Sequence, residues 1–296
     1  MGQKRKSSAS GPSGVLVLDK PIGPTSREVI AAVTRRLGLP ASGHCGTLDP
    51  LATGLLVLVS GYATRVQDLF MGHAKEYVAR IRFGATSATD DAEGPIVENV
   101  GAPPESIAGI AAALERFVGT IEQIPPALSA VHIDGERAFE KARRGESVDM
   151  PARRVVIHAC EILGYDAPRL ELRVRSGPGT YIRSLARDLG QALGTGAYLE
   201  GLRRTASGSL RIETAVAADL ATVADVRTLE ACLAAEPRSE IPPDAMPLLL
   251  QGKVVPAEHS APLARESLIW CGGIIVGRGS PFGDAAVRLK RLIRPL

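Results

Sequence analysis

Apolar and polar positions alternate with two different periods along this chain, and the change between them predicts both strands and helices. A short apolar run at 15–18 has the length of a strand. Thr25, followed by Glu28 three positions later, forms a capping box, and apolar residues then recur at helical spacing as far as Leu37. The pattern therefore predicts a strand followed by an amphipathic helix.

Further runs predict a sheet with helices packed against it. Residues 54–60 are continuously apolar and residues 77–83 alternate, so we expect two strands that are neighbours in one sheet. Alternation at 170–174 predicts another strand, whereas helical spacing at 107–118 and 180–193 predicts two helices. The order lacks a regular βαβ repeat, which favours an α+β fold, with a mainly antiparallel mixed sheet flanked by helices, over a doubly wound one.

Composition divides the chain into a short arm, a large domain and a small one. Residues 1–14 are rich in Ser, Gly, Lys and Arg, and we expect them to form a disordered basic arm. The large domain then covers 15–245, and a cluster of prolines that begins at Pro242 marks a linker. The glycine-rich residues 246–296 are expected to form a small β-rich domain.

Length and composition narrow the class of protein. The chain has 296 residues, of which 45% are hydrophobic, so it can bury a full core. Its longest apolar run, at 55–59, is far shorter than the roughly 20 residues of a membrane-spanning helix, and no leader opens the chain, so we expect a cytoplasmic protein. Four scattered cysteines without a C-x-x-C pair indicate free thiols rather than a metal site or disulfides.

Charge is distributed unevenly along the chain, although its net value is only +3. Residues 137–211 contain fourteen Lys and Arg against eight Asp and Glu, whereas 212–246 contain two against seven. The middle of the chain is therefore a candidate surface for phosphates. Solvated charge on helix faces is the simpler interpretation of the same numbers.

The segment GHCGTLDPLATG, at 43–54, presents a single carboxylate, that of Asp49, on a turn rich in glycine. Pro50 fixes its own φ and excludes the helical region for Asp49, while the glycines allow unusual backbone paths. A carboxylate on such a stiff loop can be aimed at a substrate. An ordinary Asp-Pro turn is the alternative interpretation of these letters.

This segment resembles, almost letter for letter, the catalytic loop of the TruB family of tRNA pseudouridine synthases, whose pattern is G-H-x-G-T-L-D-P followed by A-x-G. The resemblance implies the pseudouridine synthase fold, with Asp49 as the essential catalytic residue and His44 against the target RNA. It also implies a small RNA-binding domain at the C-terminal end.

Other segments are similar to further motifs of this family, in the expected order. In LDKPIGPTS, at 18–26, the resemblance implies that Lys20 and Pro21 support the catalytic loop. In KEYVARIRFGATSATDDAEG, at 75–94, it implies that Tyr77 stacks on the flipped uracil and is a candidate general base.

Two later motifs complete the implied site. GTYIRSLARDLG, at 179–190, supplies Tyr181 and Arg183, and GLRRTASG, at 201–208, supplies Leu202 for the uridine pocket. The chain departs from the family by having SGPG before TYIR in place of Cys-Ser-x-Gly, which alters the packing behind Arg183 and leaves the catalytic letters intact.

The chemistry of pseudouridine formation explains these residue types. The N1–C1′ bond breaks, the uracil turns and is rejoined through C5, and no cofactor is required. Asp49 could attack C1′, or could support loss of the base with proton removal from C2′. Burial would raise the pKa of Asp49 and a nearby Arg183 would lower it. With Thr180 as its cap, the predicted helix places Arg183 in its first turn, where a cation is disfavoured, which indicates a carboxylate partner.

The target uridine must leave its stack, and aromatic rings can compensate for that loss. Without the resemblance, Tyr77 is equally well explained as a core aromatic and His44 as a satisfied loop histidine. The segment at 123–146 resembles the start of the family's RNA-gripping insertion, here about 124–155, in which four cations would contact phosphates: Arg137, Lys141, Arg143 and Arg144.

These observations predict a stand-alone, monomeric enzyme that converts a T-loop uridine of tRNA, at the position the family numbers 55, to pseudouridine. It would need no metal, membrane or guide RNA. One alternative is the related guide-RNA-dependent class, which shares the G-H-x-G-T-L-D-P loop. The other is a non-catalytic module that binds or folds tRNA.

Overall fold

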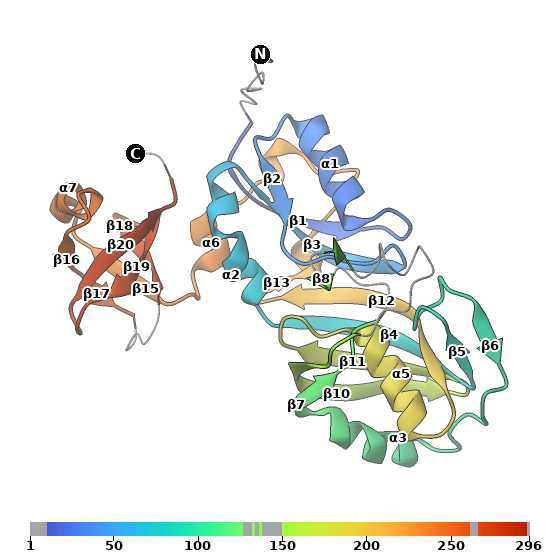
Figure 1. Cartoon of the computed structure of the whole chain (residues 1–296). Coiled ribbons are helices and arrows are strands. Elements are labelled where there is room, and N and C mark those ends of the chain that lie inside the picture. The colour runs from blue at the N-terminus through green and yellow to red at the C-terminus, as the bar shows by residue number, and fades with distance from the viewer. Residues whose placement is uncertain (1–10, 127–131, 134–135, 138–149, 261–265, 295–296) are drawn as a thin grey trace.

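The computed structural model describes residues 11–126, 132–133, 136–137, 150–260 and 266–294. Its larger part is built on a ten-stranded sheet (Figure 1). Eight strands follow one another across this sheet: β14 (Val216–Ala217), β1 (Gly14–Lys20), β3 (Ala52–Ser60), β12 (Ala197–Ser207), β4 (Lys75–Phe83), β11 (Arg169–Ser176), β10 (Arg153–Asp166) and β7 (Gly119–Gln123). Two short strands pair at its side, β2 (Ser42–His44) with β3 and β13 (Leu210–Arg211) with β12.

Among the described residues, most neighbours in this sheet are antiparallel, as predicted, and the parallel pairs are β1–β14 and β3–β12. The expectation that the strands at 54–60 and 77–83 are neighbours was wrong, because β12 lies between them. In β12, Leu202 is in register with Ala52 of β3 on one side and with Ala79 of β4 on the other. The strand that joins the two halves of the sheet thus comes late in the chain.

Helices cover the sheet in two groups. The capping box of Thr25 and Glu28 starts α1 (Ser26–Leu37), and Gly38 ends it in the left-handed conformation with φ 58°. The buried side of α1 packs on β1 and β3. On the other half of the sheet, α5 (Ile182–Ala192) and α3 (Ile107–Leu114) cover β4, β11 and β10 (Figure 1).

Two predicted helix ends need correction. The N-cap of α5 is Tyr181 rather than Thr180, whose hydroxyl instead donates to the carbonyl of Gly177 at 3.2 Å. The helix predicted over 107–118 is α-helical only to Leu114, after which a 3₁₀ turn continues to Phe117. The remaining helices of the described chain are short: α2 (Gln67–Gly72), α6 (Leu229–Leu233) and α7 (Met246–Leu250).

A second sheet of six strands forms the C-terminal part of the molecule (Figure 1). Its order is β16 (Val254–Pro256), β20 (Ala286–Leu292), β19 (Ile274–Pro281), β18 (Ser267–Cys271), β15 (Arg238–Ile241) and β17 (Glu258–His259). Two-stranded ribbons are formed by β5 (Ala85–Ser87) with β6 (Ile96–Glu98), and by β8 (His132–Ile133) with β9 (Glu136–Arg137).

The boundary expected at 245/246 does not coincide with the start of this sheet. Strand β15 already belongs to it, because Arg238–Ile241 pairs in parallel with β18. Pro243 and Pro247 occupy the first turns of a 3₁₀ helix and of α7, where proline is well tolerated, instead of an extended linker. The arm expected over 1–14 is also shorter, because Gly14 is the first residue of β1; residues 1–10 lie outside the described residues.

The two sheets share one hydrophobic core. Trp270 and Ile275 of the second sheet are buried in the same cluster as Val15 and Phe70. The guanidinium of Arg278 adds an ion pair to Asp68, just after the start of α2, at 2.5 Å. Among the described residues, no helix is both long and apolar enough to cross a membrane. The four cysteines are free, and burial raises the thiol pKa of Cys45 to about 12.

Candidate active site

Asp49 lies on the connection between β2 and β3, and its side chain is 36% exposed. The backbone turns immediately after it, where the amide of Ala52 donates to the carbonyl of Asp49 at 3.0 Å. Gly54, with φ 97°, lets β3 approach β12, because a Cβ there would collide with the backbone of Arg204. The loop that carries Asp49 is therefore short, and the chain re-enters the sheet directly after it.

Lys20 braces the far side of this turn from within the protein. Its ammonium is fully buried and donates to the carbonyls of Ala52 at 2.7 Å, of Pro21 at 2.9 Å and of Pro50 at 3.4 Å. Burial lowers the pKa of Lys20, while the Asp49 carboxylate opposes that effect. Lys20 therefore contacts the backbone that follows Asp49, and Pro21 contributes only its carbonyl oxygen; the supporting role of both residues stays a prediction.

Two buried residues that were not predicted hold the segment that precedes Asp49. The hydroxyl of Ser26 accepts from the amide of Leu48 at 2.7 Å and donates to the carbonyl of Leu48 at 2.9 Å, directly before Asp49. The guanidinium of Arg204 donates to the carbonyl of Gly46 at 3.1 Å. Both residues belong to motifs that were already recognised in the sequence. However, a polar side chain that hydrogen-bonds backbone groups leaves no sequence pattern by which it could be predicted.

Arg183 lies against Asp49, as the position of this arginine in its helix predicted. Its Nε is 3.0 Å from Oδ2 of Asp49 and its Nη1 is 3.3 Å from Oδ2 of Asp91. Only 6% of the arginine side chain is exposed. One guanidinium thus lies between two carboxylates, which fixes its plane and directs one edge toward Asp49.

Asp91 is the second acidic partner, and the sequence analysis did not single it out. It is 3% exposed, and its Oδ1 accepts from the hydroxyl of Thr89 at 2.5 Å and from the amide of Glu93 at 3.0 Å. The preceding Asp90 adopts φ 60° and pairs with Arg187 at 2.8 Å. The sequence signal for this residue was the adjacent pair Asp90 and Asp91. Adjacent aspartates in turns are too common to identify a buried carboxylate.

The electrostatics around Asp49 favour its neutral form more than usual. Burial raises the pKa of this carboxyl most strongly, Arg183 lowers it, Asp91 raises it again and Lys20 lowers it, and the net direction is upward. Burial, followed by the carboxylates of Asp91 and Asp49, also raises the pKa of Glu93. The cations Arg183 and Lys20 therefore stabilise the ionised form of Asp49, whereas burial and the charge of Asp91 destabilise it.

The remaining predicted residues lie in the larger sheet and at the start of α5. Tyr77 in β4 and Leu202 in β12 are half-buried, and each packs against both core clusters of the larger sheet, the one below α1 and the one below α5. The backbone of Tyr181 is held by the buried amide of Gln123, whose Oε1 accepts from the amide of Tyr181 at 2.8 Å and whose Nε2 donates to its carbonyl at 3.0 Å.

His44 ends β2, and its carbonyl accepts from Nε2 of Gln67 at 2.9 Å. Burial lowers the pKa of its imidazole, and the charges of Arg204 and Arg27 lower it further, so the ring is neutral at pH 7. Most of the expected insertion at 124–155 lies outside the described residues, as do the side chain of Arg137 and all of Lys141, Arg143 and Arg144. The last residues of that range are in β10, which begins at Arg153.

The larger sheet, whose neighbours are mostly antiparallel, thus carries the braced Asp49 beside the buried Arg183. Residues 34–182 match the family described as "TruB family pseudouridylate synthase (N terminal domain)", and residues 183–260 match "tRNA pseudouridylate synthase B C-terminal domain". The chain therefore belongs to the TruB family of pseudouridylate synthases.

Individual relatives agree with this assignment. "tRNA pseudouridine synthase B" of Xanthomonas axonopodis pv. citri is 51% identical over 191 residues, which is 64% of this chain and 62% of that protein. The protein of the same name from Cupriavidus pinatubonensis is 44% identical over 252 residues, or 81% of this chain and 79% of its own length. The match thus spans less than two thirds of the Xanthomonas protein.

Two solved structures with the same fold are chains of larger complexes. A chain of a Cbf5-Nop10-Gar1 complex superposes with a TM-score of 0.73 at 28% identity, over 95% of this chain and 85% of its own length. A chain of an H/ACA RNP bound to a substrate RNA that contains 2'-deoxyuridine gives a TM-score of 0.71 at 26% identity, with the same coverage.

Proposed function

We propose that this protein isomerises a uridine of tRNA to pseudouridine, and that the uridine is the T-loop residue that the family numbers 55. The observation that carries the proposal is the carboxylate of Asp49 on a turn braced from both sides, with the Arg183 guanidinium at 3.0 Å. The family assignment and the names of the tRNA-modifying relatives support the reaction and the substrate class.

Asp49 carries the chemistry in its ionised form. Either its oxygen attacks C1′ while the N1–C1′ electron pair passes to uracil N1, or it supports departure of the base as a proton leaves C2′. Both routes remain open. After the base has turned, C5 bonds to C1′; on the first route this displaces the Asp49 oxygen from C1′, and on the second a proton returns to C2′. C5 then loses its proton, for which Tyr77 is the candidate base, and N1 of the uracil takes up a proton. Product and substrate are isomers, so the reaction needs no oxidant, reductant or cofactor.

The other residues hold the extruded uridine. The ring of Tyr77 stacks on the uracil, worth about 1–3 kcal/mol per stacked base, and Leu202 and Tyr181 line the pocket beside it. The neutral ring of His44 fills the gap that the uridine leaves in the RNA stack. Cations at Arg137, Lys141, Arg143 and Arg144 contact phosphates without reading sequence. The C-terminal sheet binds a further part of the RNA.

The test measures tritium release from unmodified tRNA that carries the label at uracil C5, using the purified protein with no metal, nucleotide or guide. We expect release that disappears with Asp49→Asn, while tRNA affinity stays within a few fold. Asp219→Asn is a matched control, because it removes the charge of an exposed aspartate. Appreciable turnover by the Asp49→Asn protein would refute the role of this carboxylate.

The same experiment separates the two alternatives. The structural neighbours are chains of an H/ACA RNP bound to a substrate RNA and of a Cbf5-Nop10-Gar1 complex, so an enzyme that needs partners and a guide RNA is a specific rival. A stand-alone monomer in the cytoplasm acts on bare tRNA, whereas the guide-dependent class requires partner proteins and a guide RNA. Tight tRNA binding without any release of tritium, with or without such partners, would instead favour a tRNA-binding or tRNA-folding module.

A further inference from the structure

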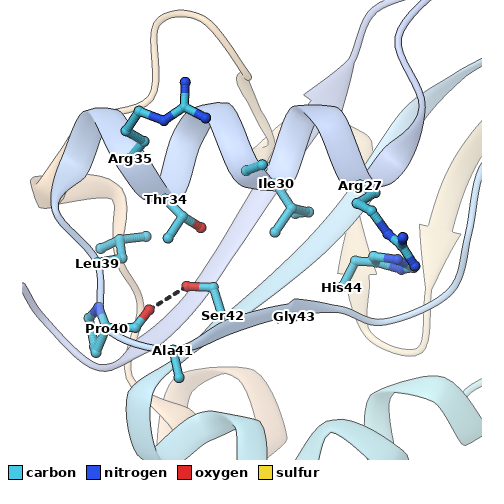
Figure 2. A pocket seen from close by; sticks show the side chains of 11 residues that line it. Arg27, Ile30, Thr34, Arg35, Leu39, Pro40, Ala41, Ser42, Gly43 and His44 are labelled. Carbon is cyan, nitrogen blue, oxygen red and sulfur yellow. Dashed lines mark hydrogen bonds between the residues drawn. The ribbon is translucent and has the colours of Figure 1, made fainter. Parts of the chain in front are cut away.

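A groove of about 610 Å³ runs between α1 and the segment that leads into β2 (Figure 2). Its volume falls within the range of about 300–1,000 Å³ that is typical of ligand sites. Figure 2 shows Arg27 and His44 side by side at one end of the groove, and Leu39 and Pro40 at the other. The full lining is Arg27, Ile30, Ala31, Thr34, Arg35, Leu39, Pro40, Ala41, Ser42, Gly43 and His44.

The lining combines cations with an apolar floor. Arg27 and Arg35 contribute positive charge, and none of the lining residues is acidic. Ile30 and Leu39 contribute buried apolar side chains to the floor. A cationic rim over an apolar floor suits a nucleotide, since the phosphate takes the charge and the base takes the floor.

Two polar atoms in the groove lack partners. The hydroxyl of Thr34 and Nδ1 of His44 are buried, and within the described ranges of the chain neither has a hydrogen-bond partner. Ser42, in contrast, is satisfied because its hydroxyl donates to the carbonyl of Pro40 at 2.8 Å. Buried polar atoms without partners are rare and call for a ligand or water at the site.

The helix dipole does not explain the position of Arg27. It lies in the first turn of α1, where the helix dipole disfavours a cation, whereas Arg35 lies in the last turn, where a cation is favoured. Arg27 is exposed, and its charge lowers the pKa of the adjacent His44. An anion bound between them would compensate for both effects.

The groove is also connected to the candidate active site. His44 is shared by both, because it lines the groove and begins the loop that carries Asp49. At the same end of α1, Ser26 bonds both backbone groups of Leu48. A strand of RNA that passes His44 on its way to Asp49 therefore meets this groove next.

We propose that the groove binds the nucleotides that adjoin the extruded uridine, with Arg27 and Arg35 on the phosphates and with Thr34 and His44 at a base edge. This subsite rests on the proposed function, because it takes the same RNA. It gives α1 a direct part in binding the substrate, beyond its support of the catalytic loop.

Equilibrium binding of unmodified tRNA across a salt series tests the subsite. Arg27→Glu and Arg35→Glu should each weaken binding about tenfold and reduce the slope of log K against log salt by about one, as the loss of one phosphate contact requires. Ala31→Trp should weaken binding without changing charge, because it fills the groove. Arg80→Glu is the matched control, since Arg80 is exposed on β4, outside the groove, and should leave affinity unchanged.

A photoactivatable group attached to a cysteine at position 31 identifies the nucleotides concerned. Crosslinks to the nucleotides that flank the target uridine are expected. Crosslinks confined to another part of the tRNA, or variants that bind like Arg80→Glu, would overturn the subsite while wild-type tritium release continued. Absence of wild-type release would instead count against the proposed function.

Discussion

The pKa of the Asp49 carboxyl is subject to opposing electrostatic effects. In the proposed mechanism the carboxyl reacts in its ionised form, yet burial and the charge of Asp91 both raise its pKa. Arg183 is the main opposing influence, and its own orientation depends on Asp91. The same acidic residue therefore both opposes the ionisation of Asp49 and positions the cation that favours it.

Replacement of Arg183 by Met should abolish most turnover and move the acid limb of the remaining activity to higher pH. Without the guanidinium, burial and Asp91 raise the pKa of Asp49 further. Single-turnover rates between pH 5 and 9 measure both effects. Arg187→Met is the matched control, because Arg187 pairs with Asp90 and Asp188 and not with Asp49. Near-normal rates in the Arg183 variant would remove this residue from the mechanism.

Asp49→Asn should leave the protein at least as stable as the wild type at pH 7. Because the pKa of this carboxyl is higher in the folded protein than its ordinary value of 3.8, the folded protein loses stability as pH rises through the interval between the two values. The asparagine is free of this cost at neutral pH, and the difference should fade as pH approaches about 4. Thermal melting of both proteins across this pH range measures it. A lower Tm for the variant at pH 7 would contradict the direction assigned to the pKa.

At the scale of elements, the start of α1 positions the catalytic loop. Ser26→Ala removes both hydrogen bonds to Leu48 and should lower the rate at saturating tRNA by about ten- to a hundredfold, because small displacements of a reacting group have large effects. Affinity for tRNA should stay within a few fold, which separates this effect from general loss of structure. Ser60→Ala is the control, since Ser60 is a buried serine at the opposite end of β3. Equal losses in the two variants would argue against positioning.

The sequence predicted the elements that depend on neighbouring residues. The capping box of α1 and its glycine stop were found because both signals lie within one turn of the helix end. The insertion of β12 between β3 and β4 was missed, because pairing across the sheet depends on residues far apart in the chain. The N-cap of α5 was missed for a local reason, since the hydroxyl of Thr180 donates to the carbonyl of Gly177, three residues earlier, instead of capping the helix.

The residues of the candidate site also fall into two groups, those that the sequence predicted and those that it did not. Asp49, Lys20 and Arg183 lie in distinctive sequence motifs. The structure pairs Arg183 with Asp49 and joins Lys20 to the backbone of Ala52, while the roles of these residues stay predictions. Asp91, Ser26 and Arg204 were missed, because they act on atoms brought close only by the fold. A sequence pattern identifies the reacting group more readily than the groups that hold it.

The whole molecule should unfold as one unit, because its two sheets share a core. Trp270, the single tryptophan, lies in the second sheet and is buried in the cluster that includes Val15 and Phe70. Denaturant curves followed by tryptophan fluorescence and by far-UV circular dichroism should therefore coincide. Trp270→Ala should lower the free energy of unfolding by about 3–5 kcal/mol. An earlier fluorescence transition in the wild type would show that the second sheet unfolds independently.

The late position of β12 in the chain also has a consequence for biosynthesis. A nascent chain that has emerged from the ribosome as far as residue 196 contains both Asp49 and Arg183, but it lacks the strand that joins β3 to β4. The loop of Asp49 then belongs to one half of an incomplete sheet and the helix of Arg183 to the other. Translation must pass β12 before the sheet that brings Asp49 to Arg183 is complete, so the onset of the proposed activity is timed by the last long strand of the larger sheet to be made.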